Sequence, residues 1–194
     1  VQELLNYKGT VDVEIVKRSL DARKKPQLFY VYMVDVTIPE EEERKVLKRC
    51  HNNQIQKIEP VKYEFPVKHY EGTERPVIVG MGPAGLFCGY VLAKAGFRPI
   101  LLERGKCVEE RSRDVEAFWE TGRLNTESNV QFGEGGAGTF SDGKLNTLIK
   151  DKYGRNKEVL RIFVKHGAQE EILYDYKPHI GTDILKEIVR SMRE

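Results

Sequence analysis

Cysteine is scarce in this sequence of 194 residues, with three in all, and neither a Cys-X-X-Cys nor a Cys-X4-Cys pair occurs. This absence excludes the redox-active disulfide of the dithiol oxidoreductases. So few unpaired thiols are typical of a reducing compartment, and we expect a cytoplasmic protein. Cys88 falls within a predicted helix, where we expect a small core residue.

The sequence also lacks an excess of charge and any long apolar run. Thirty-two Lys and Arg residues stand against 30 Asp and Glu, a net charge of +2, which gives no electrostatic reason to expect nucleic-acid or membrane binding. No stretch approaches the roughly 20 apolar residues that span a bilayer. No metal-ligand spacing occurs, and we expect neither a signal peptide nor a lipidation motif. The expected partner is a small-molecule substrate or NAD(P)H, and the oligomeric state stays open.

One segment combines a short apolar strand, a glycine-rich turn and the start of a helix. The predicted helix continues to Gly96, and a second strand over 99–102 ends on Glu103, eighteen residues after Gly85. This order predicts the first βαβ unit of a dinucleotide-binding fold. The strand and turn read Val77-Ile78-Val79-Gly80-Met81-Gly82-Pro83-Ala84-Gly85.

Each glycine of this turn has a separate predicted role. Gly80 allows the tight turn, Gly82 lets the backbone approach a pyrophosphate, and Gly85 lets the helix pack close to the strand. The pyrophosphate would bind the free N–H groups at the positive end of the helix. Glu103 would accept hydrogen bonds from the adenosine ribose and would repel a 2′-phosphate, which argues against NADP. A glycine turn that binds nothing is the simpler alternative.

The stretch GMGPAGLFCGYVLAKAGFRPILLERG, from Gly80 to Gly105, resembles the FAD-binding fingerprint of flavoproteins similar to glutathione reductase and para-hydroxybenzoate hydroxylase. The resemblance implies that Gly80, Gly82, Pro83, Ala84, Gly85 and Glu103 hold the ADP half of FAD, and it extends to Arg104. NAD as the bound dinucleotide is the alternative.

A second glycine-rich stretch, GEGGAGTFSDGKL, runs from Gly133 to Leu145. Such a loop lets the backbone approach a flat or charged ligand. In the resembled flavoproteins, a loop of this kind lies along the ribityl or isoalloxazine part of FAD. We therefore expect Gly135, Gly136 and Gly138 near that half. Lys144 is either a cation near the flavin or a phosphate, or a surface lysine.

Together with RSLDARKK at positions 18–25, this glycine-rich sequence resembles most closely a bacterial family of uncharacterised FAD-dependent (NAD/FAD-utilising) dehydrogenases.

Gly138 to Lys144 also match the pattern GxxxxGK, which is close to that of a nucleoside-triphosphate P-loop. Leu145 stands where Mg²⁺ coordination requires Ser or Thr, which argues against that reading. A loop that merely turns the chain is the simpler alternative.

Residues 1–72 predict a small α+β domain, of which a ferredoxin-like arrangement is one form. Strands are expected over 10–17, 27–37 and 55–63, with a helix from Pro39 to Arg49 and a linker over 65–75. The cations at the tip of the first hairpin could contact RNA, an acidic partner or the flavin domain, or could be solvated. They are Lys17, Arg18, Arg23, Lys24 and Lys25.

Residues 73–194 predict the second domain, of α/β class: the N-terminal part of a doubly wound, Rossmann-like FAD-binding domain. Helices are expected over 107–121, 156–166 and 182–194. Trp119 is expected on the buried side of the first, together with Val108, Val115 and Phe118. His166 is expected to be exposed, and His179 either faces the flavin or is structural.

The resembled FAD domains carry a late strand that ends in Gly-Asp, and this dipeptide is absent here. We therefore expect the sequence to be a fragment, inactive by itself. The predicted function of the whole is flavin-mediated hydride or electron transfer, in which the isoalloxazine supplies the chemistry. No catalytic acid, base or nucleophile is assigned. A plain NAD-binding domain, and a non-catalytic flavoprotein with an N-terminal docking module, are the alternatives.

Overall fold

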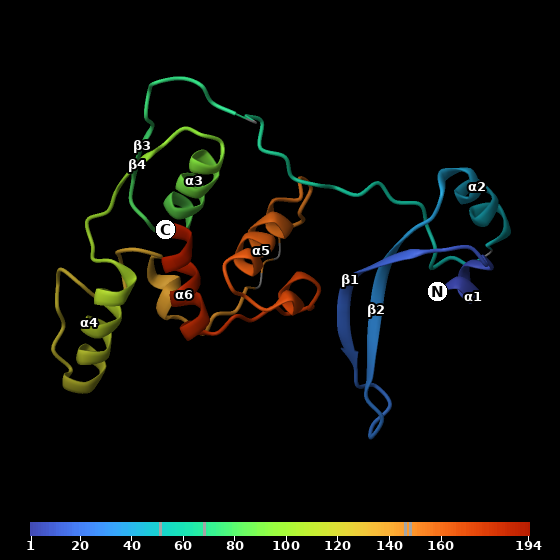
Figure 1. The fold of residues 1–194 in the computed structure, drawn as a ribbon. Helices are drawn as coiled ribbons and strands as arrows, with labels where there is room; N and C mark the ends of the chain where they lie inside the picture. The colour runs from blue at the N-terminus through green and yellow to red at the C-terminus, as the bar shows by residue number, and fades with distance from the viewer. Residues whose placement is uncertain (51, 68, 146, 148) are drawn as a thin grey trace. The chain divides into compact units, whose positions relative to one another are not determined.

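The computed structural model describes residues 1–50, 52–67, 69–145, 147 and 149–194 (Figure 1). Two compact units share the chain: unit 1 contains Val1–Lys62 and Leu173–Tyr176, and unit 2 contains Tyr63–Ile172 and Lys177–Glu194. The division therefore falls ten residues before the position that the sequence suggests, and residues 173–176 return to unit 1. Position 68 of the predicted linker lies outside the described residues.

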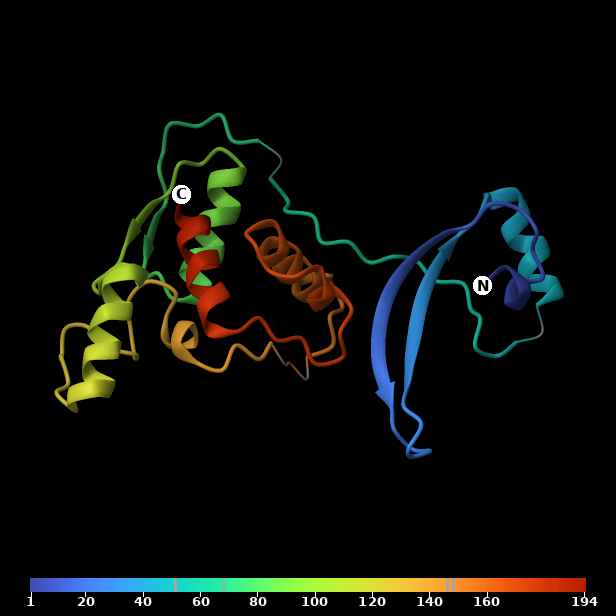
Figure 2. The same cartoon turned by 60° about the horizontal axis from the view of Figure 1, so that its bottom comes forward.

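Unit 1 begins with α1 (Gln2–Leu5), followed by the strands β1 (Asp12–Asp21) and β2 (Phe29–Thr37) and the helix α2 (Glu40–Arg49). The two strands form the antiparallel hairpin visible in Figures 1 and 2. The third strand expected over 55–63 is wrong, since these residues form no strand. Apolar residues recur there every third position, not every second, and Pro60 removes a ladder donor, so no strand face forms.

A β-bulge at Val16 divides the hairpin into two parts. Ile15 pairs with Val34 and Lys17 pairs with Met33, so one extra residue is inserted in β1. The bulge shifts the alternation of β1 by one position, which places Leu20 on the same face as Ile15. Tyr30, directly opposite Leu20, lies on that face too. The hairpin therefore has one mainly apolar face, much of it exposed near the tip.

Within unit 1, the segment Leu173–Tyr176 adds to the outer edge of β1. The N–H of Arg18 donates to the carbonyl of Tyr174 at 2.7 Å, and the N–H of Tyr176 donates to the carbonyl of Arg18 at 3.1 Å. The Arg18 guanidinium contacts both oxygens of Asp175, at 2.7 and 3.1 Å. Arg18, expected at the basic hairpin tip, therefore lies within β1 and is paired with Asp175.

Unit 2 contains the expected βαβ unit. The strands β3 (Val77–Val79) and β4 (Ile100–Leu102) are parallel, with Val77 opposite Ile100, and α3 (Pro83–Lys94) connects them. Then follow α4 (Val108–Thr121), the 3-10 turn η1 (Ala137–Phe140), α5 (Arg155–Lys165), the 3-10 turn η2 (Glu170–Leu173) and α6 (Thr182–Arg193). Across the described part of the chain, no helix is both long and apolar enough to cross a bilayer.

The core of unit 2 is centred on α6, which lies beside α3 in both ribbon views (Figures 1 and 2). Ile188 on α6 is fully buried and packs among apolar side chains of α3, α4 and α5. The core cluster consists of Leu86, Val108, Ile162, Phe163, Ala168, Ile172, Ile180, Ile188, Val189 and Met192.

Three expectations about burial in unit 2 are wrong. The inward stripe of α4 ends at Val115, and Trp119, one turn later, is 60% exposed. Cys88 is exposed, because α3 turns Gly89 and not Cys88 toward β4. His166 is half-buried: its Nδ1 lies 2.9 Å from the Ser191 hydroxyl of α6. Burial lowers the pKa of His166.

The contact of α3 with the strand end depends on Gly85. A Cβ built on Gly85 would lie 1.9 Å from the carbonyl oxygen of Gly80. We expect Gly85→Ala to lower the free energy of unfolding by about 3 kcal/mol, because backbone must move to admit the methyl group. Gly138→Ala, where a Cβ meets nothing within 4 Å, is the matched control and should cost almost nothing. Urea unfolding measures both, and equal losses would contradict this account of the packing.

Candidate functional site

The glycine-rich turn connects the end of β3 to the start of α3. Gly80 has φ +93°, a left-handed conformation that favours glycine. Its N–H donates to the carbonyl of Leu102 at 2.7 Å, which ties the turn to the end of β4. The helix begins with Pro83 after the N-cap Gly82. A Cβ built on Gly82 would meet nothing within 4 Å, so the space beside the N-terminus of α3 is open.

The Glu103 carboxylate binds the backbone that follows each of the two strands, β3 and β4. Its Oε2 accepts the N–H of Met81 at 2.5 Å, and its Oε1 accepts the N–H of Gly105 at 2.8 Å. Each carboxylate oxygen keeps a second lone pair, so the group can still accept from a ligand hydroxyl. The structure therefore places this acidic side chain against the turn, as the motif predicts.

The second glycine-rich stretch lies directly against the first. The N–H of Gly135 donates to the carbonyl of Met81 at 2.8 Å. A Cβ built on Gly136 would lie 2.9 Å from Cδ of Pro83 and 3.4 Å from Cα of Gly82. Two segments separated by about fifty residues in the sequence thus form one surface.

Arg111 of α4 holds the second stretch in place from beneath. Its side chain is fully buried, and its guanidinium donates only to backbone carbonyls. The acceptors are Asn129 (3.4 and 3.1 Å), Val130 (3.1 Å), Glu134 and Gly136 (3.2 Å). Burial lowers the pKa of Arg111, while Glu103 and Glu134 act in the opposite direction.

Sequence reasoning missed Arg111, although a signal was present. Arg111 lies three residues after Val108 and four before Val115, which places all three on one face of a helix. A charged residue on an otherwise apolar stripe is almost never buried without partners. Its position therefore predicts a nearby segment that supplies acceptors, here the glycine-rich stretch.

A buried carboxylate, Glu134, links this stretch to α4 and α6. Its side chain is 2% exposed, and its Oε2 accepts from the N–H of Val108 at 2.7 Å and from Arg193 at 2.8 Å. Burial raises the pKa of Glu134, while the Val108 N–H and Arg193 act to lower it. Arg193 also contacts Glu109 at 2.6 Å. These charges connect the start of α4 to the end of α6.

The remaining predicted residues make their contacts outside the glycine turn. Lys144 pairs with Asp142 at 2.7 Å, and this hydrogen bond raises the pKa of Lys144. Its backbone bridges to His179. Arg104 is exposed, lies over the ring of Phe132 and approaches Glu127 at 3.5 Å. Lys144 thus contacts Asp142 and His179, and the contacts of Lys144 and His179 within the described residues do not include the glycine turn.

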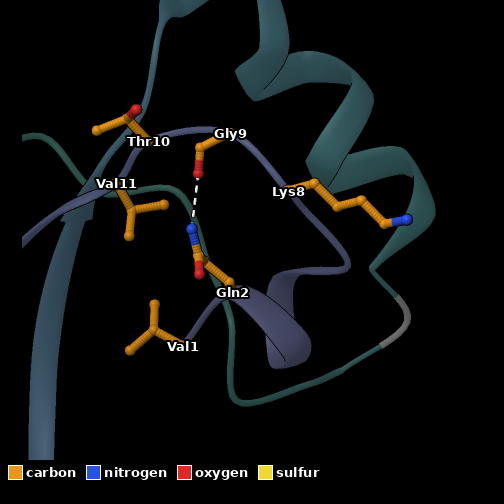
Figure 3. Close-up of a pocket in the computed structure, with 6 residues that line it drawn as sticks. All are labelled: Val1, Gln2, Lys8, Gly9, Thr10 and Val11. Atoms are coloured by element: carbon orange, nitrogen blue, oxygen red, sulfur yellow. Dashed lines mark hydrogen bonds between the residues drawn. The ribbon is translucent and has the colours of Figure 1, made fainter.

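A hollow of about 390 Å³ lies elsewhere, in unit 1 (Figure 3). The Gln2 side chain donates to the carbonyl of Gly9 at 2.8 Å, and Figure 3 shows the Lys8 side chain extending away from it. Its polar groups do not converge, so it offers no specific recognition of a ligand. It is lined by Val1, Gln2, Lys8, Gly9, Thr10 and Val11.

The Glu109–Arg193 pair makes the stability of the fold depend on pH. Arg193 holds the pKa of Glu109 down at about 2. A lowered folded-state pKa stabilises the fold above the ordinary value near 4.5 and loses that stabilisation as the pH falls toward 2. We expect the melting temperature of wild type to fall more steeply over this window than that of Glu109→Gln. Glu120→Gln, an exposed position on the same helix, is the control, and parallel curves for all three proteins would refute the pairing.

Known proteins resemble both units of the chain. Residues 5–37, which contain the hairpin, match a family described as Domain of unknown function (DUF8436). A protein of Clostridium beijerinckii, described as an uncharacterized protein, is 48% identical over 186 residues. The alignment covers 94% of this chain and 34% of that protein. The chain thus spans about a third of the length of this curated relative.

Proposed function

We propose that the chain binds FAD through the two glycine-rich stretches and forms the nucleotide-binding part of a flavin-dependent oxidoreductase. The observation that carries the proposal concerns Gly82 and Gly138. All seventeen glycines are described. Within the two glycine-rich segments, residues 80–105 and 133–145, each of the other glycines either has a left-handed φ or would collide with a neighbour if it carried a Cβ.

Gly82 and Gly138 have neither reason to be glycine. Gly82 has an ordinary φ of −65°, and a Cβ at either position meets nothing within 4 Å. The fold itself therefore does not require glycine there. A ligand that approaches the backbone would require it, and one of these glycines lies in each of the two predicted cofactor segments.

The surrounding residues fit a dinucleotide. The N-terminus of α3 offers N–H groups that have no partner inside the helix, which suits a pyrophosphate. Gly80, Gly82, Gly85 and Glu103 would hold the ADP half, with Glu103 accepting from ribose hydroxyls. Gly135, Gly136 and Gly138 would approach the other half. Bound FAD would supply the hydride or electron transfer.

The proposal includes a small-molecule or NAD(P)H partner and a cytoplasmic location. It assigns no catalytic residue. A second candidate function is a docking role for unit 1 beside a flavin that is never reduced. The apolar hairpin face, and a family match confined to the hairpin region, favour that reading.

The visible absorbance spectrum of the purified protein, incubated with excess FAD and then desalted, tests the proposal. We expect the two-band spectrum of a bound flavin, at about one FAD per chain. A colourless protein that binds NAD instead would replace FAD by NAD, and a protein that binds neither would overturn the proposal. NADH- or NADPH-dependent bleaching distinguishes an oxidoreductase from the docking reading.

Gly82→Val tests the placement of the pyrophosphate. The fold has room for the side chain, so we expect a melting temperature close to that of wild type and a loss of FAD affinity of at least about a hundredfold. Ala117→Val, on the exposed side of α4, is the control for a β-branched residue in a helix. Stoichiometric flavin in the folded Gly82→Val protein would show that the pyrophosphate does not lie there.

A further inference from the structure

We propose that Arg111 is the residue that positions the cofactor loop and supplies the positive charge facing the diphosphate of the bound dinucleotide. The inference rests on the proposed function and extends it to a residue outside both glycine-rich motifs. Arg111 would contact no part of the ligand. It would act through the loop that separates it from the glycine turn.

The geometry shows how one side chain determines the course of the loop. The Arg111 guanidinium reaches carbonyls at both ends of residues 129–136. The Cδ of Arg111 also lies 2.5 Å from where a Cβ of Gly133 would be, so the loop passes immediately over it. The planar fork of arginine suits several carbonyls at once, and lysine could not reproduce it.

The last of these carbonyls brings the guanidinium close to the proposed ligand. Gly136, which accepts from Nη1 of Arg111 at 3.2 Å, is the residue whose missing Cβ would contact Pro83 and Gly82. One peptide unit therefore lies between the buried cation and the glycine turn. Because the guanidinium is fully buried, its charge is screened less than a surface charge and acts across such a separation.

The charge of Arg111 has no direct counterion. Its hydrogen bonds all go to backbone carbonyls. Glu134 is bound by Arg193 and the N–H of Val108, and Glu103 is bound by two backbone N–H groups. A buried cation that no carboxylate contacts is costly to the fold. A diphosphate bound beside Gly82 would offset that cost.

Other cations of the region already have partners. Arg193 contacts Glu109 and Glu134, Lys144 contacts Asp142, and Lys106 contacts Asp114 at 2.7 Å. Arg104 approaches Glu127 at 3.5 Å, whereas the Cζ of Arg111 lies 4.9 Å from the centroid of the Phe140 ring and its hydrogen bonds reach no carboxylate. Among the described residues near the two glycine-rich stretches, Arg111 is thus the cation whose charge a ligand would complete.

Three substitutions separate the charge of Arg111 from its hydrogen bonds. Arg111→Lys keeps the charge and loses the fork, Arg111→Gln keeps donors without charge, and Arg111→Met loses both. Arg113→Met, an exposed arginine on the same helix, is the control. Affinities for FAD, ADP and adenosine are measured by competition, with melting temperatures recorded for every variant.

We expect FAD affinity to fall about tenfold for Arg111→Lys and about a hundredfold for Arg111→Gln and Arg111→Met. The loss should be larger for ADP than for adenosine, which lacks the diphosphate, and the salt dependence of ADP binding should weaken in the uncharged variants. If Arg111→Met does not fold, the comparison of ADP affinity between Arg111→Lys and Arg111→Gln decides the question. Equal losses for ADP and adenosine, or wild-type ADP affinity in Arg111→Gln, would overturn the inference. Wild type that binds no dinucleotide would instead refute the proposed function itself.

Discussion

The backbone of residues 80–82 is the structure on which the rest of unit 2 depends. Its groups hydrogen-bond to three separate segments: the end of β4, the Glu103 carboxylate and the second glycine-rich stretch. This convergence is possible because Gly85 lets the first turn of α3 touch the carbonyl of Gly80. A larger residue at Gly85 would displace α3, and the open space beside Gly82 would lose its shape.

Two buried charged side chains also hold the second glycine-rich stretch in its position beside the turn. Arg111 and Glu134 are almost completely buried, at a depth where unpaired charges would be expensive. Arg111 meets the requirement with carbonyls of the loop, and Glu134 with the N-terminus of α4 and Arg193. Each charge therefore ties the loop to a helix, and the loop keeps its course although it has little regular secondary structure.

The sequence predicts the parts of the structure that depend on local patterns. The strand Val77–Val79, the start of α3 and the end of α4 at Gly122 follow from hydrophobic period, glycine placement and capping. Contacts between distant segments do not follow from such patterns. The addition of residues 173–176 to β1 depends on one pair of backbone hydrogen bonds and an ion pair, which leave no periodic trace in the sequence.

Within the candidate site too, features that depend on local sequence patterns could be predicted, and contacts between distant segments could not. The glycine turn and Glu103 could be identified because their spacing reflects one local unit. The position of Arg111 on the apolar stripe of α4 signals that it is buried with partners, but the sequence does not identify which loop supplies its acceptors. The exposure of Trp119 had the same cause, since a helical stripe is buried only as far as its covering elements extend.

The hairpin of unit 1 differs from the candidate site in the polarity of its surface. Arg18 is paired with Asp175 and Arg23 with Asp21, so two of the five cations of the tip have carboxylate partners within unit 1. The face that carries Ile15, Leu20 and Tyr30 is mainly apolar, and phosphate recognition requires clustered free cations. Every residue that the proposed FAD site uses belongs to unit 2, so cofactor binding and the properties of the hairpin have separate physical origins in this chain.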